Sequence, residues 1–451
     1  MEFQLTRVYI DALIVAIEQN DISSVKPHVQ DLHPVDIADI FKEINVDQAK
    51  LIFNTLSTKT SASVLVELPE DQREKLLDHY TSKEIAEMLL GSLESDDAAD
   101  ILANLVDEKK QEVLSFLKDK DQASDIVDLL NYEEGTAGAI MAKELILVKE
   151  DWTVTRCVKE MRKQATEIDR VLTIYVVNDN NELLGTLSLK SLLIATPTAS
   201  IKRKYNKELI SVRAHQTLEE VASSMEKYDL VVIPVIDDIG RLVGRITIDD
   251  VIDFIKDEAD KDYQIASGYS QVVETSDSVW TISKSRLPWL LIGLFGGILG
   301  SLVIARYEDQ IKIYPEMAYF IPLIAAMAGN AGVQSSAIVV QGLANNSMGL
   351  MGLKGKFIKE FNVSLINGIA CSIVIFIYNL IVAGPLALGL TISISLLAVI
   401  VFATLFGAVT PLLLNKYKID PALATGPFIT TTNDIIGLLL YFMIGRLMYM
   451  M

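Results

Sequence analysis

A single carboxylate, Asp434, stands deep inside a long apolar stretch near the end of the chain, within Thr430–Asp434. A carboxylate inside a membrane span costs about 3 kcal/mol unless it faces water, a partner or an ion. The hydroxyl and amide side chains beside it, and the Gly426-Pro427 break upstream, favour a hydrated cavity, since irregular backbone at that depth persists only where it lines one. Asp434 is therefore the candidate pore ligand. A structural acid bonded to its neighbours is the alternative.

A second polar phrase, Gly329–Ser336, interrupts another apolar stretch. Small residues let helices approach closely, and amide oxygens such as those of Asn330 and Gln334 suit a hydrated cation. We predict that Asn330, and Asn433 beside Asp434, line the pore. Close helix packing explains the small residues equally well.

The third candidate is an acidic run between the repeat region and the first apolar span, residues 249–262. On a helix, Asp250, Asp253, Asp257 and Glu258 recur at spacings of three and four, so like charges stack on one face unless cations intervene. A solvated acidic face is the alternative. The direct connection to the first span favours a regulatory cation site.

The available donors decide between metals. One carboxylate per subunit with amide and backbone oxygens, and no His or Cys nearby, describes a site for a hard cation. Mg²⁺ keeps several waters and needs one or two carboxylates, whereas soft metals prefer imidazole or thiolate. We therefore predict Mg²⁺, with Mn²⁺ or Co²⁺ as poorer fits. All His residues precede the spans: His28, His33, His79 and His215.

The composition separates the chain into two kinds of sequence. It has 451 residues, 50% hydrophobic, and a net charge of −19, but from Leu287 onward it has eight basic and six acidic residues. The negative charge thus lies on residues 1–286, which disfavours binding to the phosphates of nucleic acid. The two cysteines, Cys157 and Cys371, support no disulfide framework. No cleaved targeting segment is evident, and the acidic part is predicted to be cytosolic.

Five apolar stretches are long enough to cross a bilayer, which takes roughly 20 residues per helix. They are residues 287–305, 318–343, 361–382, 386–414 and 422–447. With a cytosolic N-terminus, the basic residues that fall inside are Lys284, Arg286, Lys354, Lys356, Lys359, Lys416 and Lys418. This distribution of basic residues agrees with the positive-inside rule and places the C-terminus outside. We therefore predict a multi-pass protein in the lipid bilayer of the bacterial plasma (inner) membrane. Five spans are too few to enclose a pore within one subunit, so a second subunit of a dimer would supply the remaining walls of the pore.

Apolar residues at helical spacing predict short helices from about Tyr9 to Leu130, with breaks at Pro34, Pro69 and Gly91. An acid-x-x-acid phrase recurs there, at residues 36–39, 84–87 and 97–100. This predicts an all-α superhelical N-domain of repeated hairpins. Carboxylates that start helices and complement the helix dipole explain the phrase as well.

A different repeat follows, at an offset of 59 residues. Tyr175–Ser188 and Pro234–Thr247 each predict a buried strand, a polar turn and a second strand, with a helix after it. This resembles a tandem pair of CBS domains, α/β regulatory modules that commonly dimerise and can bind adenine nucleotides.

The nucleotide phrase of CBS domains, Gly-x-x-Thr/Ser-x-x-Asp, is kept in the second copy as Gly244, Thr247 and Asp250. The resemblance implies ribose and phosphate contacts there, with ATP as a candidate cofactor. The first copy has Ser191 in place of Asp, and packing alone explains most of the repeat, so nucleotide binding stays open.

The order of parts resembles the MgtE family of magnesium channels, and the likeness covers essentially the whole chain. Its most specific parts lie within residues 228–251, 329–334 and 426–434. It implies a multidomain membrane protein and a homodimer that takes up Mg²⁺ through a pore with Asp434 as its main ligand. The implied parts are an N-domain (1–131), two CBS domains (138–200 and 201–256), a plug helix (250–283) and a five-helix transmembrane domain (284–451).

The resemblance also implies regulatory Mg²⁺ sites on the acidic part. The positions that match the family are Asp96, Asp100, Asp229, Asp250, Asp253, Glu258 and Asp262, and the charge pattern adds Asp257. One family acid of the plug is replaced by Lys261, which weakens or relocates one site. When Mg²⁺ is scarce the carboxylates repel and the parts separate; when it is abundant, ions bridge them and hold the closed state.

Three other functions remain open from sequence. A transporter that couples Mg²⁺ to Na⁺ or H⁺ could use the same Asp434. A membrane enzyme with a CBS regulator is disfavoured, because no His-Glu-x-x-His, nucleophile elbow or paired intramembrane acids occur. A docking protein with a vestigial membrane anchor would have no need of the buried acid. We therefore expect a transporter rather than an enzyme.

Overall fold

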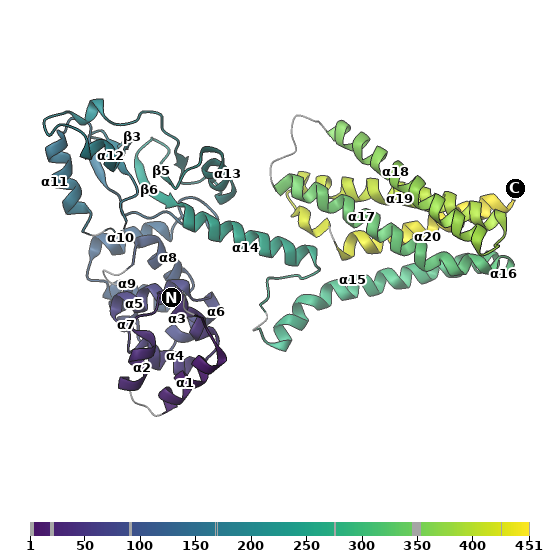
Figure 1. The fold of residues 1–451 in the computed structure, drawn as a ribbon, viewed down its shortest axis with the longest axis horizontal. Coiled ribbons are helices and arrows are strands. Elements are labelled where there is room, and N and C mark those ends of the chain that lie inside the picture. The colour runs from purple at the N-terminus through teal and green to yellow at the C-terminus, as the bar shows by residue number, and fades with distance from the viewer. Residues whose placement is uncertain are drawn as a thin grey trace. The chain divides into compact units, whose positions relative to one another are not determined.

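The fold is described here from a computed structural model. It describes residues 4–18, 22–89, 93–166, 168, 170–274, 277–344, 353–424 and 426–450. The chain divides into two compact units, Met1–Ile255 and Lys256–Met451. Most described residues are helical, and all the strands of the described part belong to the first unit (Figure 1).

Ten short helices form the first part of the first unit. They are α1 (Arg7–Glu18), α2 (Ile22–Val29), α3 (Pro34–Lys42), α4 (Val46–Phe53), α5 (Thr58–Glu67), α6 (Glu70–Leu77), α7 (Ser82–Leu89), α8 (Ser95–Ala103), α9 (Asp107–Phe116) and α10 (Lys120–Leu129). Neighbouring hairpins pack in series, with α3 on α5, α7 on α9 and α8 on α10. We refer to them together as the helical layer.

Local sequence sets the helix starts in this layer. Asn45 and Gln48 form a reciprocal capping box at α4, and Asp119 accepts hydrogen bonds from the first turn of α10. Pro34 opens α3, and Pro69 immediately precedes α6, so two of the three predicted breaks are confirmed. The third, Gly91, lies outside the described residues.

Two three-stranded sheets follow. The first has strands β1 (Leu147–Lys149), β2 (Ile174–Val177) and β3 (Leu183–Leu187), and the second has β4 (Val212–Arg213), β5 (Val232–Ile236) and β6 (Leu242–Thr247). Each sheet pairs its first two strands in parallel and its last two antiparallel. Their helices are α11 (Val154–Gln164), α12 (Leu189–Leu193) and α13 (Leu218–Tyr228), with a 3-10 turn at Ile201–Arg203.

The internal repeat extends to the details of the backbone. Tyr175 lies opposite Thr186, and at an offset of 59 residues Pro234 lies opposite Arg245. Both hairpins carry a register shift at the same place, and both turns need a left-handed residue, Asn181 in the first and Gly240 in the second. Positive φ is rare outside Gly, Asn and Asp, so the two turns meet one requirement with different residues.

The acidic run forms one helix, α14 (Ile248–Ala266), which continues from the first unit into the second. The predicted plug segment reached residue 283, but the helix ends at Ala266 and a loop separates it from the next helix. Gly268 in that loop has φ +88°, and Tyr269 and Gly268 bond back to the last turn, which stops the helix.

Five helices of the second unit are long and apolar enough to cross a membrane. The helices of this unit are α15 (Val279–Arg306), α16 (Glu308–Ile313), α17 (Ile321–Ala344), α18 (Leu353–Ile381), α19 (Leu386–Lys416) and α20 (Pro427–Met450), with 3-10 turns at Pro315–Phe320 and Pro421–Ala424. The five predicted spans are thus confirmed, although α15 starts eight residues before Leu287 because Ser278 caps it.

Helix α19 is the centre of the membrane helices and packs against α17, α18 and α20. Half of its apolar window is buried, against 11% for α15. Three of its hydroxyl groups are satisfied inside the helix, since Thr391, Ser393 and Thr410 each donate to the carbonyl four residues earlier, whereas the buried hydroxyl of Ser395 has no partner among the described residues. The internal bonds let those three residues lie in an apolar environment without an unpaired donor.

Glycine allows the closest approach between α17 and α19. A methyl group built on Gly407 would overlap the carbonyl oxygen of Gly332, whereas one built on Gly293 of α15 meets no atom within 4 Å. Backbone atoms cannot move aside as a flexible side chain can, so any Cβ at Gly407 must push the two helices apart.

We predict that Gly407→Ala lowers the stability of the purified protein by about 1 to 3 kcal/mol through overpacking. The matched control is Gly293→Ala, which gains the same helix propensity but meets open space. Thermal unfolding in one detergent compares the two variants with the unmodified chain. Equal unfolding temperatures for both variants would contradict the close contact.

Candidate functional site

The predicted pore acid lies on α20, where this helix packs against α17. Asp434 is half-buried, and its carboxylate oxygen is 3.3 Å from the position that a Cβ on Gly329 would take. The side chain of Thr430 lies against the same position, with its Cγ2 2.9 Å away. The two polar phrases predicted from sequence are therefore neighbours in space, and Gly329 leaves room for the carboxylate.

The two predicted pore amides differ in position. Asn330 is exposed on α17, whereas Asn433 is completely buried and packs against Gly332. Neither amide atom of Asn433 has a hydrogen-bond partner among the described residues. The structure thus brings Asn433 next to the glycine phrase but does not bring Asn330 and Asn433 to one surface.

The sequence interpretation missed one acid of the membrane helices. Glu360 lies on α18, within a helix segment long enough to span, and accepts a hydrogen bond of 2.8 Å from the hydroxyl of buried Ser335. The predicted span begins one residue later, at Phe361, because the charged residues Lys359 and Glu360 precede the apolar pattern. Asp434 is therefore accompanied by a second carboxylate in these helices.

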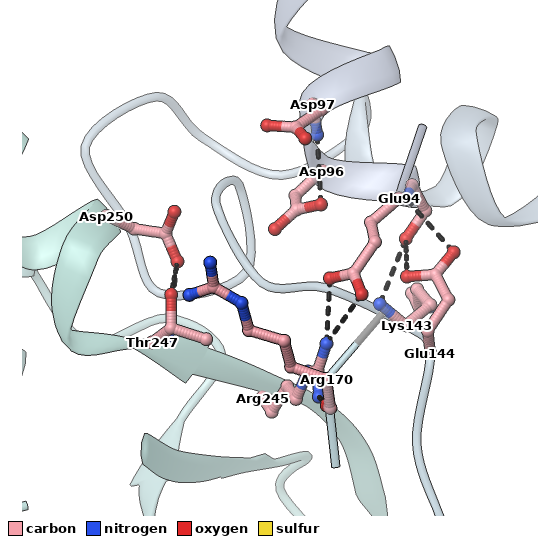
Figure 2. Close-up of polar contacts among 10 residues, drawn as sticks. Glu94, Asp96, Asp97, Lys143, Glu144, Arg170, Arg245, Thr247 and Asp250 are labelled. Carbon is pink, nitrogen blue, oxygen red and sulfur yellow. Dashed lines mark hydrogen bonds and ion pairs between the residues drawn. The ribbon is translucent and has the colours of Figure 1, made fainter. Parts of the chain in front are cut away.

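Acidic residues of the first unit meet where α8 and α14 begin. Asp96 and Asp97 are in the first turn of α8, directly after its N-cap Glu94, and Asp250 is in the first turn of α14. Glu144 comes from the chain just before β1 (Figure 2). We call these five residues, Glu94, Asp96, Asp97, Glu144 and Asp250, the acidic interface, because they join the helical layer to the CBS-like part.

Three carboxylates of the acidic interface could hold a metal ion. Glu94, Asp96 and Glu144 each have one oxygen within 4.8 Å of the others. Oxygen-only ligands of this kind suit Mg²⁺ or Ca²⁺ rather than softer metals. Glu144 is oriented by two hydrogen bonds of 3.0 Å, from the backbone N–H and the hydroxyl of Ser95.

Burial and neighbouring negative charges raise the pKa of four carboxyl groups of the acidic interface, those of Asp96, Asp97, Glu144 and Asp250. Burial, then the neighbouring charge of Asp97 and Asp250, raises the pKa of Asp96 well above its usual range. Burial, then the charges of Asp250 and Glu94, raises the pKa of Asp97 to about 7. Burial also raises the pKa of Glu144 and Asp250. A divalent cation would relieve both the desolvation and the repulsion.

The other predicted regulatory acids of the first unit have different surroundings. Asp100 pairs at 2.5 Å with Arg73, whose side chain is only 7% exposed, so a cation of the chain already holds it. Asp229 caps α13 in a left-handed conformation and is exposed. Asp253 is exposed on α14, and its charge adds to burial in raising the pKa of Glu67.

The acids at the end of α14 belong to the second unit, where Glu258 pairs with Lys261 at 3.0 Å. Burial and the charge of Asp420 raise the pKa of Asp262. Lys261 therefore pairs with one acid of this group. The remaining predicted ligand, Asp257, is exposed on the same helix.

The predicted nucleotide residues are engaged within the protein. The hydroxyl and the N–H of Thr247 both donate to Asp250, at 2.5 and 3.2 Å, and this starts α14. Gly244 faces Met141, with no room for a side chain. Asp250 is thus shared between the nucleotide phrase and the acidic interface.

Sequence reasoning missed Glu94, Asp97, Glu144 and Arg245 as members of one site. Arg245 is buried on β6 and donates from one nitrogen to both oxygens of Glu94, at 2.8 and 2.7 Å. The available signal was an Arg in a strand where the first copy has Thr186, and a Glu just before the predicted start of α8. Neither signal identifies the partner, 151 residues away.

The five membrane-length helices of the described part, together with the unit that carries the two sheets, define a multi-pass membrane protein with a second, separately folded unit. Family models match residues 321–444 as a divalent cation transporter, 32–135 as an MgtE intracellular N domain, and 137–197 and 201–257 as CBS domains. The chain therefore belongs to the MgtE family of divalent cation transporters. This confirms the predicted family and fold class, and the family is one of transporters rather than enzymes.

Relatives match along nearly the whole chain. The magnesium transporter MgtE of Bacillus subtilis is 31% identical over 95% of both chains, and that of Thermus thermophilus is 31% identical over 96% of this chain and 97% of the relative. The cytosolic domain of the Mg²⁺ channel MgtE in complex with ATP is 30% identical, with a TM-score of 0.51, over 54% of this chain and 99% of that structure. The soluble part of a magnesium transporter is 29% identical, with a TM-score of 0.50, over 56% of this chain and 98% of that structure.

We predict that Mg²⁺ binding to the protein releases protons near neutral pH. The raised pKa means that Asp97 keeps a proton in the assembled interface at a pH where a solvated carboxyl group would have lost it. The contribution of Asp97 to the stability of the assembled state is therefore fully present in acid and is lost as the pH rises through about 7. At that pH, Mg²⁺ should displace about half a proton from Asp97 per chain. Calorimetric titration in buffers of different ionisation enthalpy measures this number.

The variant Asp97→Asn should lower the proton release, and the control Asp249→Asn, at an exposed neighbour of Asp250, should not. Release that is unchanged in Asp97→Asn would show that other groups carry the protons.

Proposed function

We propose that this protein conducts Mg²⁺ into the cell across the bacterial plasma membrane, and that Mg²⁺ bound to its cytosolic acids closes the pathway. The observation that supports this most directly is the position of Asp434, which lies on a membrane helix against the small residues of α17. A carboxylate there needs an ion, water or a polar partner. The relatives that match almost the full length are named magnesium transporters.

The proposed ligand of the pore is Asp434, with Asn433 and Asn330 as further oxygen donors. Buried Asn433 lacks a partner among the described residues, which fits a side chain that reorients when an ion or a second subunit is present. Because α15 and α18 are mostly exposed in the single chain, they leave apolar surface for lipid and for a partner helix. A homodimer with a cytosolic N-terminus and an extracytosolic C-terminus is the assembly we propose.

The proposed sensor is the cytosolic part. Asp96 and Asp250 repel each other across the acidic interface, and Mg²⁺ would bridge them and stabilise the assembled state. Asp100, Asp229, Asp253, Asp257, Glu258 and Asp262 remain proposed ligands of weaker sites. ATP at Gly244, Thr247 and Asp250 is a second proposed ligand, supported by the ATP complex of the related cytosolic domain.

We predict that Asp434→Asn abolishes Mg²⁺ entry into proteoliposomes loaded with a Mg²⁺ indicator dye. The amide keeps the shape of the side chain but not its charge, so the cation loses its only charged ligand in our proposal. The matched control is Asp309→Asn, which removes a fully exposed acid from the same unit. An imposed membrane potential without a Na⁺ or H⁺ gradient separates a channel from a coupled transporter.

Entry that is equal in Asp434→Asn and the unmodified protein would mean that the pathway lies elsewhere. Entry that requires a Na⁺ or H⁺ gradient would favour the coupled transporter.

We predict that Asp96→Asn with Asp250→Asn leaves entry intact but makes it insensitive to Mg²⁺ on the cytosolic face. The double variant removes the repulsion that Mg²⁺ would relieve, so Mg²⁺ no longer favours one state. Entry is measured over a range of cytosolic-face Mg²⁺, with Asp249→Asn as the control. Inhibition as strong as in the unmodified protein would remove this regulatory proposal.

A further inference from the structure

The loop that follows α14, residues 267–273, is fixed to the start of α15. The backbone N–H and the hydroxyl of Ser270 both donate to the carbonyl of Ser285, at 3.0 Å each. A guanidinium nitrogen of Arg286 donates to the hydroxyl of Tyr269 at 2.8 Å, and the guanidinium carbon lies 5.2 Å from the centre of that ring. A hydrogen bond from a charged donor and a cation–π contact thus act on one pair, and the loop is held against the first turns of α15.

The last turn of α14 is bonded to the same loop. The side-chain amide of Gln264 donates to the carbonyl of Val273 at 2.9 Å and accepts from the N–H of Val273 at 2.8 Å. The N–H of Tyr269 donates to the carbonyl of Gln264 at 3.0 Å. These bonds leave the loop little freedom to absorb a movement of α14, so the end of the helix and the loop must shift together.

The loop and the end of α14 also lie against the first residues of α20. A methyl group built on buried Gly268 would be 3.0 Å from the Cγ of Pro427. One built on Gly426 would overlap the carbonyl oxygen of Ala266. Both glycines have a positive φ, +88° and +62°, which residues with a side chain rarely adopt. The lack of a side chain at both positions therefore lets the backbone at the end of α14 contact the start of α20.

The first turn of α20 leads directly to the proposed pore acid. The N–H and the hydroxyl of Thr430 both donate to the carbonyl of Gly426, at 3.1 and 3.0 Å. Thr430 and Asp434, one turn apart on α20, both lie against the Cβ position of Gly329 on α17. Because a helix moves as a rigid element, a displacement of its first turn shifts both side chains relative to α17.

We infer that the contact between Gly268 and Pro427 couples α14 to α20, so that a shift of the end of α14 moves Asp434 relative to α17. Gly268 is then a positioning residue, because it acts on the ion only through α20. This inference rests on the proposed function and deepens it, since it names the contact by which the acids of α14 act on the pathway. Coupling between two sites requires such a shared element, whose position both sites bias.

Hydrogen exchange tests this coupling in the full-length protein in lipid nanodiscs. Exchange of residues 427–440 is measured by mass spectrometry in a chelator and in saturating Mg²⁺. In the unmodified protein, Mg²⁺ should slow exchange there by about fivefold or more. The double variant Asp96→Asn with Asp250→Asn should lose this response, although Mg²⁺ still reaches Asp434. An equal response in the double variant would mean that Mg²⁺ acts at the pore directly, and would overturn the inference.

The variant Gly268→Asn places a side chain against Pro427. Asn tolerates a positive φ, so the backbone strain stays small while the added Cβ separates the loop from α20. The response of residues 427–440 to Mg²⁺ should fall to less than about twofold. The matched control is Gly240→Asn, at the same φ of +88° but with no atom within 4 Å. Asn181 already occupies the corresponding turn of the first repeat, so the control should respond like the unmodified protein.

A second variant covers the case in which Gly268→Asn does not fold. Tyr269→Leu removes both contacts with Arg286 and leaves Gly268 in place, so it should weaken the response in the same direction. Responses of both variants equal to that of the unmodified protein would overturn the inference, as would an α20 that does not respond to Mg²⁺ in the unmodified protein. Because exchange is measured without transport, a protein whose α20 responds but which admits no Mg²⁺ into proteoliposomes would contradict the proposed function alone.

Discussion

The first unit depends on one electrostatic constraint, namely that carboxyl groups of two folds must share a poorly hydrated space. Asp96 and Asp97 start α8, where the helix dipole favours negative charge, and Asp250 starts α14 for the same reason. Each acid is favourable at the start of its own helix. Bringing the three acids close together is unfavourable, because burial and like charges raise the pKa of Asp96, Asp97 and Asp250. Cations, protons or the guanidinium of Arg245 must therefore accompany the assembled state.

The membrane helices meet a different constraint, since an apolar environment leaves no water for unpaired polar groups. Helix α19 satisfies the hydroxyl groups of Thr391, Ser393 and Thr410 internally, and Gly332 and Gly407 let α17 and α19 approach to backbone contact. Asn433 is not satisfied in this way, because neither of its amide atoms has a partner among the described residues. The buried hydroxyl of Ser395 on α19 is another exception, and Asn433 stands directly before Asp434 on α20.

The sequence predicted what depends on local pattern. The length of the apolar stretches predicted the five spans. The sequence repeat at an offset of 59 residues predicted two similar strand pairs, and the two sheets share the same pairing register and the same register shift. It could not predict pairings between distant residues, such as Arg245 with Glu94 or Arg73 with Asp100, because charge alone does not choose a partner. Asp100, predicted as a regulatory metal ligand, pairs with Arg73 in the structure. Glu360 lies outside the predicted span because the apolar pattern begins only at Phe361, whereas the helix begins at Leu353.

The two groups of acids are suited to different tasks with one ion. A site that senses Mg²⁺ must hold it for long enough to stabilise one arrangement, and several desolvated carboxylates provide strong, charge-dependent binding. A site that conducts must release the ion, so its binding has to stay weak. A lone carboxylate beside glycine and amide groups, as at Asp434, lets the ion keep its water. Under the proposed function, the density of carboxylates, high in the acidic interface and low on α20, would therefore separate sensing from passage within one chain.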